Sequence, residues 1–211
     1  VYRWDESLFW NVYYIKGAFL DADKAFEVIN GMRTVEVRVL LKAINTMVLA
    51  RALAAHPAIN VQCSAVEGNE NYALRERLMY LGLPAPLFTI DLDTEMGRKI
   101  SRHAFQRFFD CLEPAFGLQV TLGQVNTVVV CPALTSHSEL SDEALREAGI
   151  SLTTIRIAVG DEDPRSLLAH LMQAAELALE PECPGFSRHF GQPQAIDALY
   201  ESIYVDVHRR Y

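Results

Sequence analysis

The chain has 211 residues, of which half are hydrophobic and 22% are charged, a composition typical of a globular domain with a real core. Its 19 Lys and Arg against 27 Asp and Glu give a net charge of −8. This balance argues against nucleic acid or an anionic membrane as a partner, because both require a basic surface. No apolar run approaches the roughly 18 residues of a membrane span.

The four cysteines lie far apart in the sequence and form no C-x-x-C pair, so neither a zinc site nor a disulfide framework is expected. Reduced thiols indicate a cytoplasmic protein.

The first predicted helix runs from Asp21 to about His56, where apolar residues recur at helical spacing until Pro57 ends the pattern. A helix of this length is unusual in a globular domain, so we expect a break or bend near Gly31. Three further elements are predicted: a strand at 59–65, a helix at 69–82 and a strand at 85–92. Residues 93–112 are predicted to form the next helix, with Asp93 or Thr94 as its cap.

In the second half, residues 118–123 and 127–132 are predicted to form a pair of short extended segments around a turn at Gly123. A short helix at 141–149 with Ser141 as cap is followed by a strand at 153–159. Asp163 and Pro164 then open another helix. From about Glu180 the sequence is broken by Pro and Gly, and a last helix with one apolar face follows at 194–208.

This alternation of strands and helices predicts an α/β or α+β domain, in which a small sheet is covered by helices. We expect the last helix to bury its apolar face against a neighbouring element or chain.

The strand "TTIRIAV" carries an arginine, Arg156, on the face opposite Ile155 and Ile157. A permanent cation is costly to bury unless an anion meets it, and the strand itself supplies none. A structural carboxylate and a ligand are both possible partners. Spacing alone does not separate these two interpretations.

The other sequence motifs do not indicate a specific function. The six histidines have no ligand spacing, so we expect them at the surface or at helix caps and expect no metal site. The acidic run at 161–163 is better explained by the start of the following helix than by a cation site. Phosphate-binding glycine loops and the usual nucleophile motifs are missing from the sequence.

Around Arg156 the sequence resembles a known family. The segment "TLGQVNTVVVCPALTSHSELSDEALREAGISLTTIRIAVGDEDP", which starts at Thr121, resembles the C-terminal end of the Cys/Met-metabolism pyridoxal-phosphate (PLP) enzymes. These are the cystathionine synthases and lyases, methionine γ-lyase and O-acetylhomoserine sulfhydrylase. Upstream, "GAFLDADKAFEVINGMRTVEVRV" and "ALAAHPAINVQC" resemble earlier segments of the same family in the same order, so that the similarity spans about residues 17–179.

The resemblance implies the C-terminal domain of a fold-type I PLP enzyme, with a small, mainly antiparallel sheet covered by helices and preceded by a long connecting helix. Residues 1–20 would end the large domain, 21–180 would form the connecting helix and small domain, and 181–211 a linker and helical extension. Arg156 matches the arginine that binds the substrate α-carboxylate, and Thr121 matches a serine beside that carboxylate. Cys131 departs from the family's usual histidine.

The cofactor implied by the resemblance is pyridoxal 5′-phosphate, which needs a lysine to hold it and donors for its phosphate. None of the chain's lysines (Lys16, Lys24, Lys42 and Lys99) lies in a setting like that of the family's cofactor lysine. We therefore expect no catalytic residue in this chain and no activity by the chain alone. The N-terminal half of the enzyme, or a companion chain, would carry the lysine and most of the PLP site.

The implied function is β/γ-elimination or γ-replacement on a cysteine-, methionine- or homoserine-type substrate, in a cytoplasmic homotetramer. The alternative is a non-catalytic binding or assembly module that kept the small-domain fold.

Overall fold

The computed structural model describes residues 5–92 and 100–211. The chain divides into two units, Val1–Arg38 and Val39–Tyr211, each described here by itself. The caps predicted at Asp93 and Thr94 lie outside the described residues. The helix that follows them, α5 (Arg102–Asp110), is capped by Ser101, whose hydroxyl accepts from the Ala104 amide at 3.1 Å.

The first unit is helical and has no core of its own. It contains α1 (Glu6–Leu8), a π-helical turn η1 (Phe9–Tyr14) and α2 (Ala22–Arg33), and none of these elements has a buried residue. The predicted long helix is broken at Thr34, three residues after Gly31 and so close to the expected position, and α3 (Val35–Ala54) begins after it. Thr34 leaves the helical region at φ −114° and ψ 3°, while Gly31 stays within the helix.

The second unit is built on a five-stranded sheet in the order β1-β2-β5-β4-β3. Its strands are β1 (Ile59–Gln62), β2 (Leu87–Leu92), β5 (Ile155–Ala158), β4 (Val128–Val130) and β3 (Gly117–Leu118). Three of the four pairings are antiparallel, and only β3 and β4 run parallel. The predicted small, mainly antiparallel sheet is therefore confirmed.

The predicted extended segment at 127–132 contains β4, whereas of the segment at 118–123 only Leu118 lies in a strand, β3. A hairpin would make the two strands antiparallel, whereas Gly117 and Leu118 pair with Val128 and Val129 in parallel register. Residues 119–127 instead form a loop between these strands. The loop returns to the sheet where the Gly117 amide donates to the Thr127 carbonyl oxygen at 2.9 Å.

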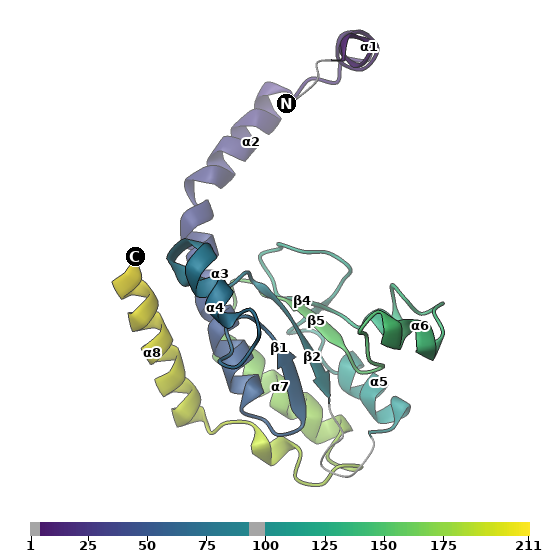
Figure 1. The fold of residues 1–211 in the computed structure, drawn as a ribbon, viewed down its shortest axis with the longest axis vertical. Helices are drawn as coiled ribbons and strands as arrows, with labels where there is room; N and C mark the ends of the chain where they lie inside the picture. Colours follow the sequence, from purple (N-terminus) through teal and green to yellow (C-terminus); the bar gives the residue numbers. More distant parts are fainter. Residues whose placement is uncertain (1–4, 93–99) are drawn as a thin grey trace. The chain divides into compact units, whose positions relative to one another are not determined.

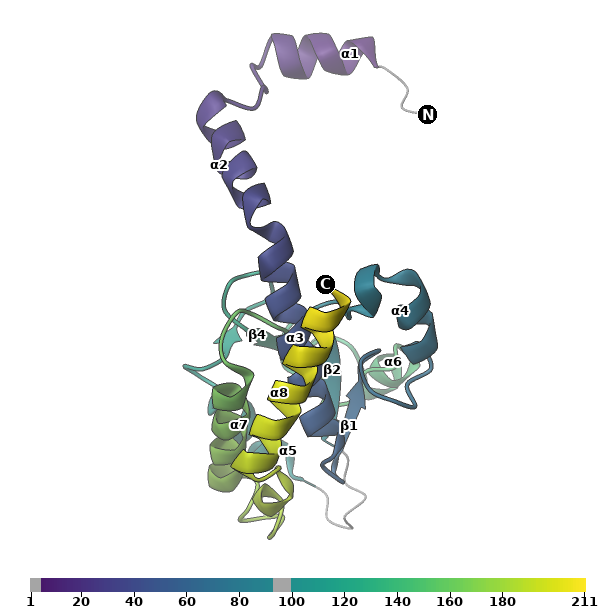
Figure 2. The same ribbon diagram turned by 90° about the vertical axis from the view of Figure 1, so that its left-hand side faces the viewer.

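The core lies on one face of the sheet. Phe88, Ile90, Ile155 and Ile157 from β2 and β5 belong to the same buried cluster as side chains of α3, α5, α7 (Pro164–Ala178) and α8 (Pro193–Arg210). Figures 1 and 2 show α3, α7 and α8 gathered on this side of the sheet. Asp163 caps α7 and Pro164 is its first residue, as predicted.

The remaining elements are short. They are α4 (Tyr72–Leu78), α6 (Asp142–Glu147) with its predicted cap Ser141, and three 3₁₀ turns: η2 (Tyr80–Gly82), η3 (Pro132–Leu134) and η4 (Ser187–His189). In the described part of the chain, no helix is long and apolar enough to cross a membrane.

The C-terminal helix packs on the body of the second unit, which confirms the expectation for its apolar face. Ile203 and Val207 of α8 are 2% and 1% exposed and belong to the core cluster. At the C-terminal end of α8, Arg210 forms an ion pair with Glu76 of α4, the residue that follows Arg75. The distance between Arg210 Nη1 and Glu76 Oε2 is 3.1 Å.

One histidine is not at the surface as predicted. His56 is 2% exposed, its Nε2 lies 2.9 Å from the Phe186 carbonyl oxygen, and the Ala58 amide donates to its Nδ1 at 3.1 Å. These contacts fit a neutral ring that donates from Nε2 and tie α3 to the segment leading into α8. Burial lowers the pKa of His56, and nearby His189 lowers it further.

This pKa shift predicts a loss of stability in mild acid. The unfolded chain binds a proton at His56 as the pH falls below its ordinary pKa of 6.5, whereas the folded chain resists it. Stability should therefore decrease as the pH drops from 6.5 toward the folded-state pKa. Unfolding in urea at pH 7.5 and pH 5 should show a larger loss for the wild type than for His56→Gln. Equal losses in both proteins would contradict this assignment.

Candidate functional site

The candidate site lies on the sheet face opposite the main core. Arg156 of β5 stands between Thr89 of β2 and Val130 of β4 in the strand register. Val130 and Ala158 on this face are buried but do not belong to the main core cluster. This face therefore has a small apolar surface of its own beside Arg156.

Arg156 has no ionic partner within the described residues. The side chain is half-buried, and no carboxylate there lies within 4.0 Å of its guanidinium. Its Nε is buried and makes no hydrogen bond. An internal ion pair, one of the two interpretations open from the sequence, is therefore not what the structure shows.

The nearest carboxylate along the strand register is already in use. Asp91 follows the β2 residues that pair with β5, and its Oδ1 accepts hydrogen bonds from the hydroxyls of Ser151, at 2.6 Å, and Thr154. No ion pair joins Asp91 to Arg156. Within the described residues the guanidinium therefore has no carboxylate partner.

Thr121 lies in the loop 119–127 and is half-buried. Its neighbours Val120 and Leu122 are 65% and 53% exposed. The structure shows no hydrogen bond between Thr121 and Arg156 within the described residues. The loop does connect β3 to β4, and β4 is the direct neighbour of β5.

The loop is fixed to the end of β5 by groups that sequence reasoning did not identify. The Glu162 carboxylate accepts from the Thr127 amide at 2.7 Å and from the Thr127 hydroxyl at 2.8 Å. The Asp161 amide donates to the Val125 carbonyl oxygen at 2.7 Å. The three acids at 161–163 therefore have different roles. Only Asp163 caps α7, where its carboxylate accepts from the Arg165 amide at 2.9 Å.

A cofactor lysine is missing from the described part of this face. Lys42 is 6% exposed, forms an ion pair with Asp161 at 3.7 Å and donates to the Gln124 carbonyl oxygen. Lys24 is bonded to Glu27 on α2, and Lys99 lies outside the described residues. Lys24 and Lys42 are therefore both engaged with carboxylates of the described chain and do not fit the attachment of PLP.

Cys131, at the position where the resemblance leads one to expect histidine, is fully buried. Burial raises the pKa of its thiol. A thiol with a raised pKa is mostly protonated near neutral pH and is a poor nucleophile. Cys131 therefore contributes packing after β4 rather than chemistry.

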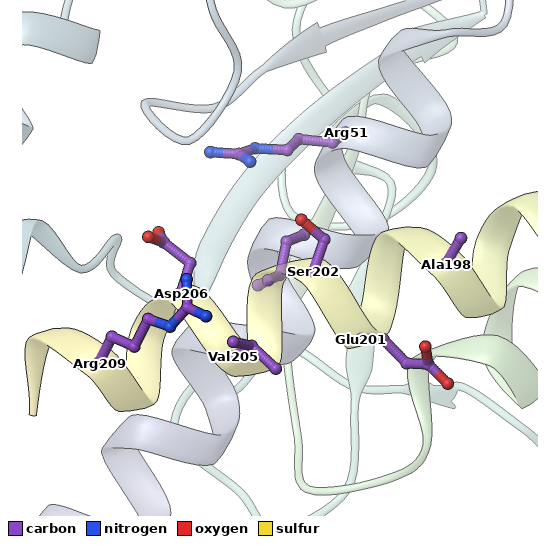
Figure 3. Close-up of a pocket in the computed structure, with 8 residues that line it drawn as sticks. Arg51, Ala198, Glu201, Ser202, Val205, Asp206 and Arg209 are labelled. Atoms are coloured by element: carbon purple, nitrogen blue, oxygen red, sulfur yellow. The ribbon is translucent and has the colours of Figure 1, made fainter.

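A hollow lies on the helical side of the unit, between Arg51 of α3 and one flank of α8 (Figure 3). Its volume is about 520 Å³, and it is lined by residues of both charges, including Glu201, Asp206 and Arg209. None of the residues predicted from the sequence lines it. Ile203, which lines this hollow, belongs to the core cluster that also contains Ile155. The core therefore lies between the hollow and Arg156.

Comparison with known proteins identifies the family. The sequence profile of the Cys/Met metabolism PLP-dependent enzymes matches residues 3–176. The chain belongs to this family. An L-methionine gamma-lyase from Pseudomonas deceptionensis is 32% identical over 161 residues, which cover 76% of this chain and 38% of that protein. A homocysteine synthase from Schizosaccharomyces pombe is 29% identical, over 72% of this chain and 34% of that protein.

The likeness extends to solved structures. The cystathionine gamma synthase from Xanthomonas oryzae pv. oryzae, solved in complex with cystathionine, matches with a TM-score of 0.61 and 26% identity. This match covers 74% of the chain and 38% of that protein. The chain thus spans less than two fifths of these relatives and corresponds to their C-terminal region. Helix α8 lies beyond the residues that match the family profile.

Measurements of stability can distinguish Arg156, which has no carboxylate partner among the described residues, from Arg75, whose guanidinium has internal hydrogen-bond acceptors. Arg75 is 3% exposed and donates to the carbonyl oxygens of Ser64 and Gly82 and to Glu76. Arg75→Gln should lower the free energy of unfolding by about 2–4 kcal/mol, because it leaves buried acceptors unpaired. Arg156→Gln should change it by less than about 1 kcal/mol.

Urea unfolding of both variants beside the wild type measures this difference. A loss of several kcal/mol in Arg156→Gln would mean that the guanidinium has an internal partner after all.

Proposed function

We propose that the chain is the C-terminal part of a PLP-dependent enzyme of sulfur amino-acid metabolism and that Arg156 binds the α-carboxylate of the substrate. The observation that carries this proposal is the half-buried guanidinium without a carboxylate partner among the described residues. A cation in this position lowers its free energy when an anion arrives. A planar guanidinium can grip a carboxylate through two parallel hydrogen bonds, which a lysine cannot do.

The free energy of hydrogen bonds between a guanidinium and a carboxylate is large enough to contribute to substrate binding. Charge-assisted hydrogen bonds contribute roughly 1.5–3 kcal/mol each. The apolar neighbours Val130 and Ala158 strengthen such bonds, because they lower the local dielectric. Thr121, with its hydroxyl, would support the same end of the substrate.

The cofactor would be bound by the rest of the enzyme. PLP supplies the electron sink for elimination or replacement at the β or γ carbon, and this chain would orient the substrate toward it. The relatives are more than twice as long as the matched region, and the missing part would carry the cofactor lysine. It could precede this sequence in the same polypeptide or be a companion chain.

The first unit supports the need for this missing part. It exposes large apolar side chains, among them Trp10, Tyr14, Phe19, Phe26 and Met32, which are 49–66% exposed. Isolated helices of this length with no buried face are not stable in water, and apolar surface on this scale marks an interface. Assembly into a homotetramer in the cytoplasm is part of the same proposal.

The alternative function is a non-catalytic binding or assembly module. It is favoured by one observation: the lysines in the described residues are either paired or remote from Arg156 in the sequence. Such a module would keep the sheet and its helices and bind a carboxylate without chemistry.

Visible absorbance distinguishes the two functions. We expect the 211-residue chain alone, mixed with PLP and dialysed, to be colourless. The native preparation, with the preceding polypeptide or companion chain, should keep the absorbance band of lysine-bound PLP. A native preparation that is colourless and contains no second polypeptide would favour the module, and colour retained by the chain alone would contradict the division of roles.

Arg156→Lys in the complete enzyme tests the carboxylate role. The substitution keeps the charge but loses the two-point grip, so kcat/KM for the amino acid should fall by about tenfold or more. The absorbance of bound PLP should be nearly unchanged. Unchanged turnover and apparent affinity would show that Arg156 does not hold the carboxylate.

A further inference from the structure

We propose that a buried hydrogen-bond network formed by Lys42, Asn45, Thr127 and Glu162 positions the loop 119–127, and with it Thr121, relative to Arg156. These four residues are called the loop latch below. The inference rests on the proposed function for its catalytic meaning, although the latch itself is a property of this chain. All four members act through the loop, so they are positioning residues and do not touch the substrate.

The centre of the latch is the contact between Thr127 and the turn after β5. Thr127 is 0% exposed. Its hydroxyl donates to Glu162 Oε2 at 2.8 Å and accepts from the Gly160 amide at 2.9 Å. The Thr127 amide donates to the other carboxylate oxygen of Glu162. One threonine therefore closes a ring of bonds between the end of the loop and the residues that directly follow the Arg156 strand.

Gly160 allows the two backbones to come this close. A Cβ atom at this position would lie 2.3 Å from the Val125 carbonyl oxygen and 2.4 Å from the Asn126 carbonyl carbon. Both are backbone atoms of the loop, so neither can move aside alone. This contact explains why a glycine is needed after β5.

Helix α3 fixes the other side of both segments. The Asn45 side chain is 1% exposed and donates to the carbonyl oxygens of Gly160 at 3.2 Å and Glu162 at 2.9 Å. Lys42, one helical turn earlier, donates to the Gln124 carbonyl oxygen in the loop and pairs with Asp161. The loop and the turn after β5 are thus attached to one rigid helix as well as to each other.

The loop needs such attachment because its outer side chains do not hold it. Val120, Leu122 and Val125 are 65%, 53% and 66% exposed. Without the latch, these aliphatic side chains would favour a collapsed loop, since burial of apolar surface is favourable. With the latch, residues 124–127 keep a fixed place beside the turn after β5, and Thr121 lies three residues before this attached part of the loop.

The first test measures the loop in the 211-residue chain, without any cofactor or companion. Thr127→Val keeps the shape of the side chain and removes its hydroxyl, and Thr127→Ser restores the hydroxyl. Hydrogen exchange followed by mass spectrometry should show exchange at 119–127 and 160–162 faster by roughly tenfold or more in Thr127→Val. Thr127→Ser and Glu176→Gln, an exposed acid on α7, should match the wild type. Unchanged exchange in Thr127→Val would overturn the latch, whatever the enzyme does.

The second test uses the complete enzyme and separates positioning from stability. Thr127→Val should raise KM for the amino acid several-fold, while PLP absorbance and folding at the assay temperature stay the same, and Thr127→Ser should restore KM. A loosened loop with unchanged KM would overturn the positioning role. If Arg156→Lys also has no effect, the proposed function fails; if Arg156→Lys impairs capture and Thr127→Val does not, only the latch inference fails.

Discussion

The candidate site depends on one cation, Arg156, which has no carboxylate partner among the described residues. Arg156 sits in the middle of a sheet with Ile155 and Ile157 packed beneath it, and Asp91, the acid nearest to it along the strand register, is bonded to Ser151 and Thr154 instead. A protein that only needed stability would pair this charge or replace it by an apolar residue, since buried charges rarely add to stability. The free guanidinium is a cost in the isolated chain that an anionic ligand removes.

The surroundings of Arg156 are built to stay in place before any ligand arrives. The strand order puts β4 and its loop beside β5, and buried polar groups of α3 hold the loop and the turn after β5 together. Preorganised groups bind more tightly because less conformational entropy is lost when the ligand binds. The same logic explains why Lys42 is unsuited to a cofactor: its ammonium already serves Asp161 and the Gln124 carbonyl.

The two units of the chain are in different situations. The second unit buries a complete core of sheet and helices, and α8, outside the family-matched residues, adds Ile203 and Val207 to it. The first unit has no buried residue in its helices before Thr34. The relatives are more than twice as long as the match, and under the proposed function the exposed apolar side chains of the first unit would contact the part of the enzyme that carries the cofactor.

The sequence by itself determined the class of the fold, the mainly antiparallel sheet, the caps at Ser141 and Asp163, and the arginine in its strand, because these depend on local periodicity and on a family pattern. It did not determine that Arg156 has no carboxylate partner among the described residues, that β3 and β4 run parallel, or that the long helix is interrupted at Thr34. The polar pair Lys42 and Asn45, one helical turn apart in an apolar stretch, was a visible signal of the latch. Only the tertiary structure could give these residues their partners at 124–127 and 160–162, because contacts between distant segments are set by packing and not by neighbours in the sequence.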